Sequence, residues 1–193
     1  MKPLSLIELA NELSSLPGIS KKNAEKIAYH LANSEDGVGE DLIESIQNVN
    51  RKISRCEVCN HLAEAGVCSI CSDKSRTKIL VVVETPLDIF KFEEMLDFKP
   101  FYHVLGGLIN VSKKISFEEL NIDNLKERAS KMNEVILALS PNLEGIVTAN
   151  YIKEILYDQK VTQLAQGIPL GAAMEYVDEI TLKAALENRK EVK

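Results

Sequence analysis

Four cysteines, gathered in one short stretch of the chain, carry the clearest chemical signal in the sequence. Cys56 and Cys59 form one Cys-x-x-Cys pair, and Cys68 and Cys71 form a second pair after eight intervening residues. Thiolates at this spacing can surround Zn²⁺ tetrahedrally, with sulfur–metal bonds of about 2.3 Å. Because all four positions are cysteine, no coordination position is left for a reactive water molecule. The spacing therefore predicts one structural zinc ion per chain.

Redox chemistry is the alternative use of a Cys-x-x-Cys pair. We expect a cytoplasmic protein, in which thiols stay reduced, because the N-terminal residues lack the long apolar block of a secretory signal. His61 lies two residues after Cys59 and could replace one ligand. Four thiolates already satisfy zinc, so we expect His61 at the surface. The segment between the two pairs is too short for a hydrophobic core of its own, so metal binding would supply its folding free energy.

Two glutamates are predicted to lie at one edge of a sheet. The apolar run Lys78–Glu84 ends in Glu84 and is typical of a buried parallel strand. A second run, Val135–Leu139, is followed by a loop that contains Glu144. Sites in α/β sheets lie at the carboxyl ends of the strands, so both acids are expected at the same edge. Nearby amides could simply hold Glu84 there, or the two acids could form a surface for a basic patch on another protein.

This pairing of a strand-end glutamate with a later acid-x-acid-x-x-Gly loop resembles the Toprim domain of topoisomerases, primases and some nucleases. The resemblance implies a glutamate that handles protons and two aspartates that hold Mg²⁺. The chain keeps Glu84 but has Ser140 and Asn142 at the two aspartate positions, so the metal site loses two charges. We therefore expect no Mg²⁺-dependent phosphoryl transfer. A Mg²⁺-dependent Toprim enzyme, such as a nuclease or a primase-like protein, is the alternative function.

Near the N-terminus, the spacing of apolar residues predicts two short helices joined by the turn Leu16-Pro17-Gly18-Ile19. The first covers Leu4–Ser14, and the second begins after Ser20, a good N-cap. The arrangement resembles the helix-hairpin-helix DNA-binding motif. Gly18 would let the backbone approach a phosphate, which the N–H groups around Gly18, Ile19 and the helix start would bind. The candidate DNA-binding residues are Gly18, Lys21, Lys22 and Lys26. An ordinary αα-hairpin with solvated lysines is the alternative.

The remaining elements set the fold class. After a polar loop over 33–40, a third helix is predicted over 41–53. Beyond the cysteines, strands alternate with helices, which predicts a mostly parallel sheet with crossover connections. Strands are predicted over 78–84, 102–105, 135–139 and 161–164, and helices from Thr85-Pro86 and over 122–132, 144–156 and 181–190. The predicted fold is α/β multidomain, with a helix-hairpin-helix domain (1–53), a four-cysteine zinc finger (54–76), a Toprim domain (77–172) and a short C-terminal helical element (173–193).

Composition limits the classes of protein. The 193 residues are 45% hydrophobic, which suffices for a buried core, and no apolar run approaches the roughly 18 residues of a membrane span. The net charge of −6 argues against a protein that coats nucleic acid by overall charge. Contact with DNA must therefore come from a local patch, and within residues 16–31 the three lysines face only Glu25. With 5% aromatics and no Trp, an extended base-stacking surface is not expected.

The order of these motifs resembles the RecR family of bacterial recombination mediators. The matching segments cover nearly the whole chain: LPGI with KKNAEKIAYHL, CEVCNHLAEAGVCSICSD, VVVETPLDI, YHVLGGLIN, ILALSPNLEG and QGIPLGAAMEYVDEITL. One departure is Met174, which follows Ala172 and Ala173 where relatives often have a Gly-rich stretch with an acid. We predict no nucleotide site there.

The resemblance implies a non-catalytic, nucleoid-associated protein of DNA repair that forms dimers and a tetrameric ring able to encircle DNA. It implies action with RecO and RecF at single-stranded gaps and duplex junctions, without sequence preference, to help RecA replace single-strand-binding protein. Lys22 and Lys26 match family positions that face DNA, and Glu84 and Glu144 match positions implicated in binding partner proteins. The resemblance does not decide whether the protein is a dimer or a tetramer in solution, or whether it acts with RecO alone or with both RecO and RecF. A protein that is stabilised by zinc and binds other proteins, without a DNA role, is a further alternative.

Overall fold

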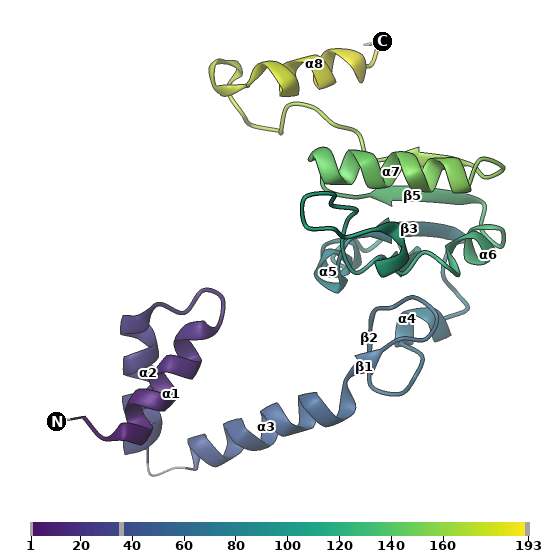
Figure 1. Ribbon diagram of the computed structural model, residues 1–193. Helices are drawn as coiled ribbons and strands as arrows, with labels where there is room; N and C mark the ends of the chain where they lie inside the picture. Colours follow the sequence, from purple (N-terminus) through teal and green to yellow (C-terminus); the bar gives the residue numbers. More distant parts are fainter. Residues whose placement is uncertain (1, 35–36, 192–193) are drawn as a thin grey trace. The chain divides into compact units, whose positions relative to one another are not determined.

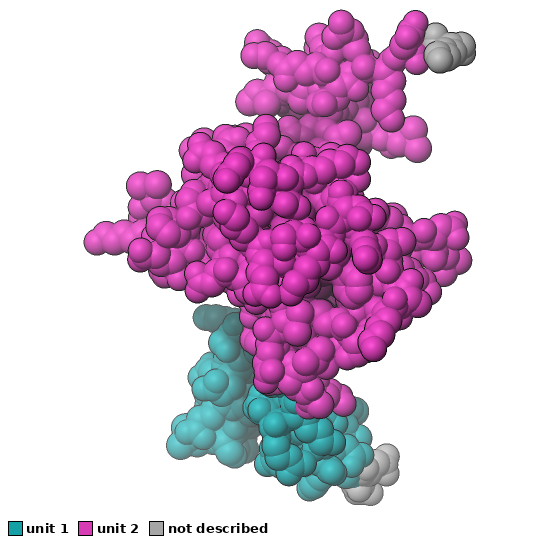
Figure 2. All heavy atoms as spheres, turned by 90° about the vertical axis from the view of Figure 1, so that its right-hand side faces the viewer, with its two compact units in different colours: residues 1–53 teal, residues 54–193 magenta. Residues whose placement is uncertain are grey.

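The computed structural model describes residues 2–34 and 37–191, which fall into two compact units (Figure 1). Unit 1 contains residues 1–53 and unit 2 contains residues 54–193, drawn in teal and magenta in Figure 2. Over the described residues, none of the helices is both long and apolar enough to cross a bilayer.

Unit 1 begins with a helical hairpin, as predicted. Helix α1 spans Leu4–Ser15 and helix α2 spans Lys21–Asn33, and the two pack through small side chains. Ser20 caps α2, because its hydroxyl accepts a hydrogen bond from the amide of Asn23 at 3.3 Å. The buried residues of the pair are all alanines, which lets the two helices approach closely: Ala10, Ala24 and Ala28.

Helix α3 spans Val38–Lys52 and begins three residues earlier than predicted. Gly37 precedes it with φ 69°, a left-handed conformation that favours glycine and sets the point at which the helix can start. Two acids in the first turn, Glu40 and Asp41, also favour the earlier start through the helix dipole. Residues 35–36 of the predicted loop lie outside the described residues.

Unit 2 opens with the cysteine-rich segment. Strand β1 (Ser54–Arg55) pairs antiparallel with strand β2 (Leu62–Ala63), and the short helix α4 (Ser69–Ser72) follows. Three of the four cysteines are buried together with residues of the neighbouring sheet, including Tyr102 and Val104. The segment therefore shares a hydrophobic core with the sheet instead of having one of its own.

The rest of unit 2 is an α/β domain with a four-stranded sheet in the order β4-β3-β5-β6. All neighbouring strands are parallel, which confirms the predicted fold class. The strands are β3 (Ile79–Val83), β4 (Phe101–Val104), β5 (Glu134–Ala138) and β6 (Val161–Gln163). The helices are α5 (Pro86–Glu93), α6 (Leu125–Ala129), α7 (Leu143–Ile155) and α8 (Glu179–Glu187), with 3-10 turns at Phe117–Glu119 and Met174–Tyr176.

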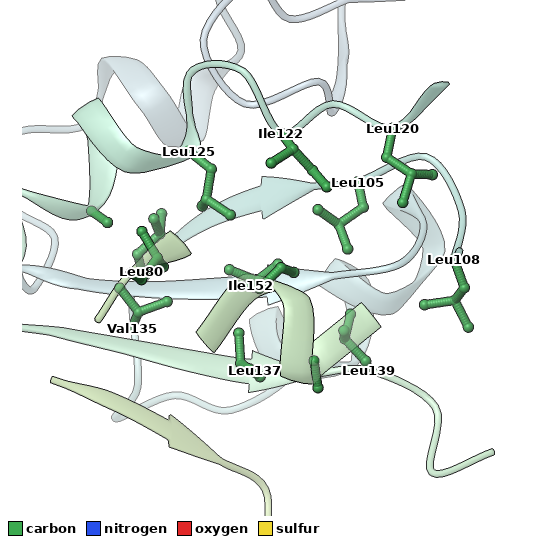
Figure 3. Close-up of a cluster of buried hydrophobic side chains, with 14 residues drawn as sticks. Leu80, Leu105, Leu108, Leu120, Ile122, Leu125, Val135, Leu137, Leu139 and Ile152 are labelled. Carbon is green, nitrogen blue, oxygen red and sulfur yellow. The ribbon is translucent and has the colours of Figure 1, made fainter. Parts of the chain in front are cut away.

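The two faces of β3 belong to two different hydrophobic clusters. Leu80 and Val82 join the cluster that α7 covers, and Val81 and Val83 join the cluster that contains the cysteines. Side chains alternate along a strand, so one continuous apolar run fills both faces. Figure 3 shows the first cluster, in which side chains of β3, β5, α7 and the 105–125 segment converge. Ile152 of α7 is fully buried at its centre.

Helix α6 is shorter than the predicted span of 122–132. The chain just before it is held to the end of β4, because the amide of Asn121 donates to the carbonyl of Leu105 at 2.9 Å. Ile122 is buried in the cluster from this non-helical position. The apolar residues whose spacing suggested a longer helix are therefore buried partly by a loop that packs against the core.

Arg76, in the segment between α4 and β3, forms hydrogen bonds that hold this segment against the sheet domain. Arg76 makes two hydrogen bonds to the carboxylate of Glu93, at 2.7 and 2.6 Å, and one to the carbonyl of Pro100 at 2.9 Å. The hydroxyl of Tyr102 donates to the same carboxylate at 2.8 Å. The hydrogen bonds from Arg76 hold the pKa of Glu93 below its usual value. This network holds the cysteine-rich segment in place against the sheet.

Candidate functional site

The four cysteine sulfurs form a cluster that fits a tetrahedral zinc ion. All lie within 4.8 Å of one another, and the sulfurs of Cys59 and Cys68 are 3.5 Å apart. A tetrahedron with zinc–sulfur bonds of about 2.3 Å has sulfur–sulfur edges of roughly 3.8 Å, which matches this cluster. Cys56, Cys59 and Cys68 are buried and Cys71 is partly exposed. A disulfide is absent from the described residues, and all four thiols are available as ligands.

Two tight turns place the sulfurs. The amide of Cys56 donates to the carbonyl of His61 at 2.7 Å, and Asn60 takes a left-handed φ of 64° to close this turn. In the second pair, Cys68 precedes α4 and Cys71 lies within it. The amide of Cys68 donates to the sulfur of Cys56 at 3.3 Å, so the two turns face each other. Backbone amides directed at sulfur are the expected partners of zinc-bound thiolates.

The pKa values of the thiols show why this cluster needs a cation. A hydrogen bond with Cys71, and burial, raise the pKa of Cys59 far above its usual value. Burial raises the pKa of Cys68 to about 11. Burial would also raise the pKa of Cys56, but the amides of Cys68, Cys59 and Val58 outweigh it and lower it to about 7. Four thiolates at this distance repel one another, and a divalent cation is what allows all of them to be charged.

The first cysteine turn lies directly on the sheet domain. The amide of Val104 in β4 donates to the carbonyl of Cys59 at 2.9 Å, and the side chain of Asn60 donates back to the carbonyl of Val104 at 3.2 Å. His61, which we expected at the surface, is only 9% exposed. Its ring packs edge-on against Phe90 of α5, with ring centroids 6.0 Å apart. The docking of the finger on the sheet, which the local sequence does not encode, buries this histidine.

The predicted acidic edge exists, and each acid has a hydrogen-bond partner from a distant segment. The hydroxyl of Ser140 donates to Glu84 at 3.0 Å, and the side-chain amide of Asn110 donates to Glu144 at 3.2 Å. Both glutamates are partly exposed. They line an open cleft of about 330 Å³ at the carboxyl ends of the strands, together with Gly107, Leu108, Asn110, Lys113, Ile115 and Asn142.

Asn142 has a structural task at the position where the Toprim pattern has an aspartate. Its side-chain oxygen accepts a hydrogen bond from the amide of Gly145 at 2.8 Å and caps α7. Sequence reasoning missed Asn110 and Lys113 as members of this cleft. They lie in a loop closed by a bridge between Asn110 and Ile115, and no local motif marks them. The arrangement offers two carboxylates with neutral hydrogen-bond donors and one nearby lysine, instead of three clustered acids.

In unit 1, the hairpin turn is exposed and places Gly18 in a left-handed conformation. Gly18 has φ 82° and is exposed, with open space where a side chain would be. Lys21, Lys22 and Lys26 are exposed. The amide of Ile19, expected to be available, donates instead to the carbonyl of Leu16 at 3.2 Å because the turn closes on itself.

The acid that opposes these lysines is neutralised from within unit 1. The ammonium of Lys2 lies 2.9 Å from the carboxylate of Glu25, and this hydrogen bond raises the pKa of Lys2. Both side chains are about half exposed, so the pair adds little stability, but it offsets the charge of the one acid among the residues of the lysine-bearing stretch 16–31.

Comparison with known protein families accounts for almost the entire chain. Residues 6–49 match the RecR helix-hairpin-helix model, and residues 53–73 match the RecR zinc finger domain of the four-cysteine type. Residues 78–165 match the Toprim domain, and residues 167–190 match the RecR C-terminal model. With this match and the geometry of the four sulfurs, the cysteines bind one structural zinc ion.

Individual relatives align with this chain over nearly their whole length. The Recombination protein RecR of Bifidobacterium animalis subsp. lactis is 41% identical over 189 residues, which cover 95% of this chain and 94% of the relative. That of Finegoldia magna is 39% identical over 198 residues, covering 99% and 98%. That of Thermus thermophilus is 41% identical over 193 residues, covering 98% of each. Since identity of this level extends over nearly the whole chain, the protein belongs to the RecR family.

Proposed function

We propose that this protein is a non-catalytic DNA-binding clamp and adaptor in recombinational DNA repair. It acts with RecO and RecF at single-stranded gaps and helps to load RecA. One observation carries the proposal: at the two Toprim positions where aspartates would hold Mg²⁺, Asn142 caps a helix and Ser140 donates to Glu84. The fold is retained while its phosphoryl-transfer centre is replaced by hydrogen bonds internal to the protein. Membership of the RecR family supports the same conclusion.

The DNA contact is assigned to the helical hairpin of unit 1. The exposed Gly18 turn lets the backbone come close to a phosphate, and α2 begins beside it. Lys21, Lys22 and Lys26 supply positive charge on α2 without reading base sequence. One hairpin with so few lysines binds weakly. A dimer, or a tetrameric ring, multiplies the phosphate contacts and raises avidity without new chemistry. Light scattering with and without gapped DNA and RecO distinguishes these assemblies from a monomer.

The salt dependence of DNA binding tests this interface. In the Lys22→Ala/Lys26→Ala variant, we expect weaker binding to gapped DNA and a slope of log K against log[salt] that is smaller by about 1–2. The physical reason is that each substituted lysine no longer neutralises a phosphate, so binding releases about one fewer counterion from the DNA per lysine. Fluorescence anisotropy from 50 to 300 mM salt, about the range over which such slopes are resolved, provides the measurement.

The matched control is Lys52→Ala/Lys74→Ala, which removes the same charge from exposed lysines outside the hairpin. Its slope should stay that of the wild type. An unchanged slope in the hairpin variant would move the DNA contact elsewhere. Absence of DNA binding by the wild type, even with RecO present, would favour an interaction protein without a DNA role.

The alternative of a Mg²⁺-dependent Toprim enzyme makes the opposite prediction about turnover. We expect the purified protein neither to cut nor to extend DNA or RNA with Mg²⁺ or Mn²⁺, because two anionic ligand positions are neutral. Gel assays on single-stranded, duplex and gapped substrates, run beside a Mg²⁺-dependent nuclease, provide the measurement. Turnover that disappears in Glu84→Gln would establish the enzymatic alternative.

Glu84 and Glu144 are assigned to partner binding. They lie at one edge and are partly exposed, so they can pair with a basic patch on RecO. In Glu84→Gln/Glu144→Gln we expect binding to the RecO protein of the same organism to weaken by about 10-fold or more, with DNA binding by the hairpin unchanged. Titration calorimetry measures the affinity. The control Glu118→Gln/Glu154→Gln removes two exposed acids elsewhere on the domain, and an equal loss there would refute a specific role for this edge.

A further inference from the structure

Arg128, in helix α6, is a buried cation without an acidic partner. The residue is only 9% exposed, and none of the ion pairs formed between described residues includes it. A guanidinium removed from water is strongly destabilised unless negative charge compensates it. Since none of the described carboxylates forms an ion pair with Arg128, another group is needed to offset its charge.

A buried histidine holds Arg128 in place. The Nη1 group of Arg128 donates to Nδ1 of His103 at 2.8 Å, and Nε2 of the same ring lies 2.5 Å from the carbonyl of Asn121. Arg128 can only donate, so Nδ1 accepts and Nε2 carries the proton. Burial lowers the pKa of His103 to about 4, which keeps the ring neutral. His103 thus orients the guanidinium but does not neutralise it.

The elements that carry this pair are the ones that touch the first cysteine turn. Asn124, one helical turn before Arg128, directs its side-chain amide at the carbonyl of Val58. Val104, next to His103 in β4, donates to the carbonyl of Cys59 at 2.9 Å. Burial lowers the pKa of Arg128, and the groups that raise it are the four cysteines. Through these contacts, the elements that carry Arg128 and His103 lie against the turn that holds two of the zinc ligands.

We propose that Arg128 is the counter-charge of the zinc centre, and that His103 is the residue that positions it. Zn²⁺ with four thiolates carries a net charge of −2, in a site where three of the four cysteines are buried. The guanidinium offsets part of this charge from the Toprim domain. Zinc is then retained well only while the finger is docked on α6 and β4. Outer-shell groups of this kind typically change metal affinity by about 10–100-fold.

Two substitutions separate the charge of Arg128 from its hydrogen bond. Arg128→Gln keeps a donor for His103 and removes the charge, whereas Arg128→Lys keeps the charge. The full-length, zinc-loaded proteins are mixed with excess chelator, and zinc release is followed with a chromogenic indicator. We expect release from Arg128→Gln to be about 10–100-fold faster than from the wild type, and release from Arg128→Lys to stay within about threefold. The control Lys126→Gln removes an exposed charge from the same helix and should release zinc at the wild-type rate.

A spectroscopic measurement distinguishes a charge effect from loosened packing. In Co²⁺-substituted protein, the thiolate-to-cobalt charge-transfer band should shift in Arg128→Gln and not in Lys126→Gln, because the nearby positive charge alters the energy of the sulfur electrons. Equal zinc release from Arg128→Gln and the wild type would overturn the proposal. Release from Arg128→Lys as fast as from Arg128→Gln would overturn it too. Should Arg128→Gln not fold, loss of zinc from a folded Arg128→Lys protein would still overturn the proposal, because that variant keeps the charge.

Discussion

Replacement of Cys59 by serine is expected to abolish zinc binding and unfold the cysteine-rich segment at the start of unit 2. Cys59 is fully buried in the sulfur cluster, and a hydroxyl there is a poor ligand for zinc. Apparent zinc-binding free energies of about 10–16 kcal/mol in such fingers are folding free energy, so their loss removes most of what orders this segment. Elemental analysis should give about one zinc per chain for the wild type and none for the variant.

Ser69→Ala provides the control for that experiment, because it changes an exposed residue between two ligands without touching a sulfur. It should retain zinc and the wild-type melting temperature. Acid should release zinc from the wild type as well. The pKa values of Cys59 and Cys68 lie above neutrality in the metal-free cluster, so binding zinc must displace protons, and affinity falls as pH falls. A Cys59→Ser protein that stays fully folded and metal-free would contradict a structural role for the ion.

Replacement of Gly145 by alanine is expected to destabilise the Toprim domain by roughly 2–5 kcal/mol. An added Cβ would overlap the carbonyl oxygen of Ser140 and meet its carbonyl carbon at 3.0 Å and the side-chain oxygen of Asn142 at 3.2 Å. Two of these atoms are backbone atoms of the tight loop before α7, and the third, the Oδ1 of Asn142, is held by its hydrogen bond from the amide of Gly145. The loop must open, and the cap at Asn142 is lost with it. Urea denaturation followed by circular dichroism measures the midpoint.

Gly39→Ala is the matched control, because Gly39 lies within α3 and has open space where a side chain would be. There, alanine should be neutral or stabilising by up to about 1 kcal/mol, since it restricts the unfolded chain and favours the helix. If Gly145→Ala unfolds at the same urea concentration as the wild type, the close approach of Gly145 to the carbonyl of Ser140 does not restrict which residue this position accepts. The same variant also reports on the acidic edge, because Ser140 positions Glu84.

Local features of the sequence were sufficient to predict the zinc ligands and most of the helices and strands. The Cys-x-x-Cys spacing identified all four sulfurs that cluster, because a tight turn is decided by the residues within it. Ser20 was predicted as a helix cap and is one, since capping bonds join residues three apart. The continuous apolar run before Glu84 predicted a strand buried on both faces, and the parallel sheet follows from its alternation with helices.

Contacts between distant segments account for the features that local patterns did not predict. The burial of His61 against Phe90, the hydrogen bond from Asn110 to Glu144 and the pairing of Arg128 with His103 each join segments that lie far apart in the sequence. The periodicity of apolar residues and the spacing of motifs indicate the buried face and the local hydrogen bonds of one helix, strand or turn. The contacts between distant segments depend instead on how these elements pack against one another. The shortness of α6 also results from a contact between distant segments. Ile122 is buried in the hydrophobic cluster although it lies in a loop, because hydrogen bonding to the end of β4 holds that loop in place. Residue types and their spacing were thus enough to identify the zinc ligands and the two acids at the sheet edge, whereas the groups that surround them depend on how distant elements pack together.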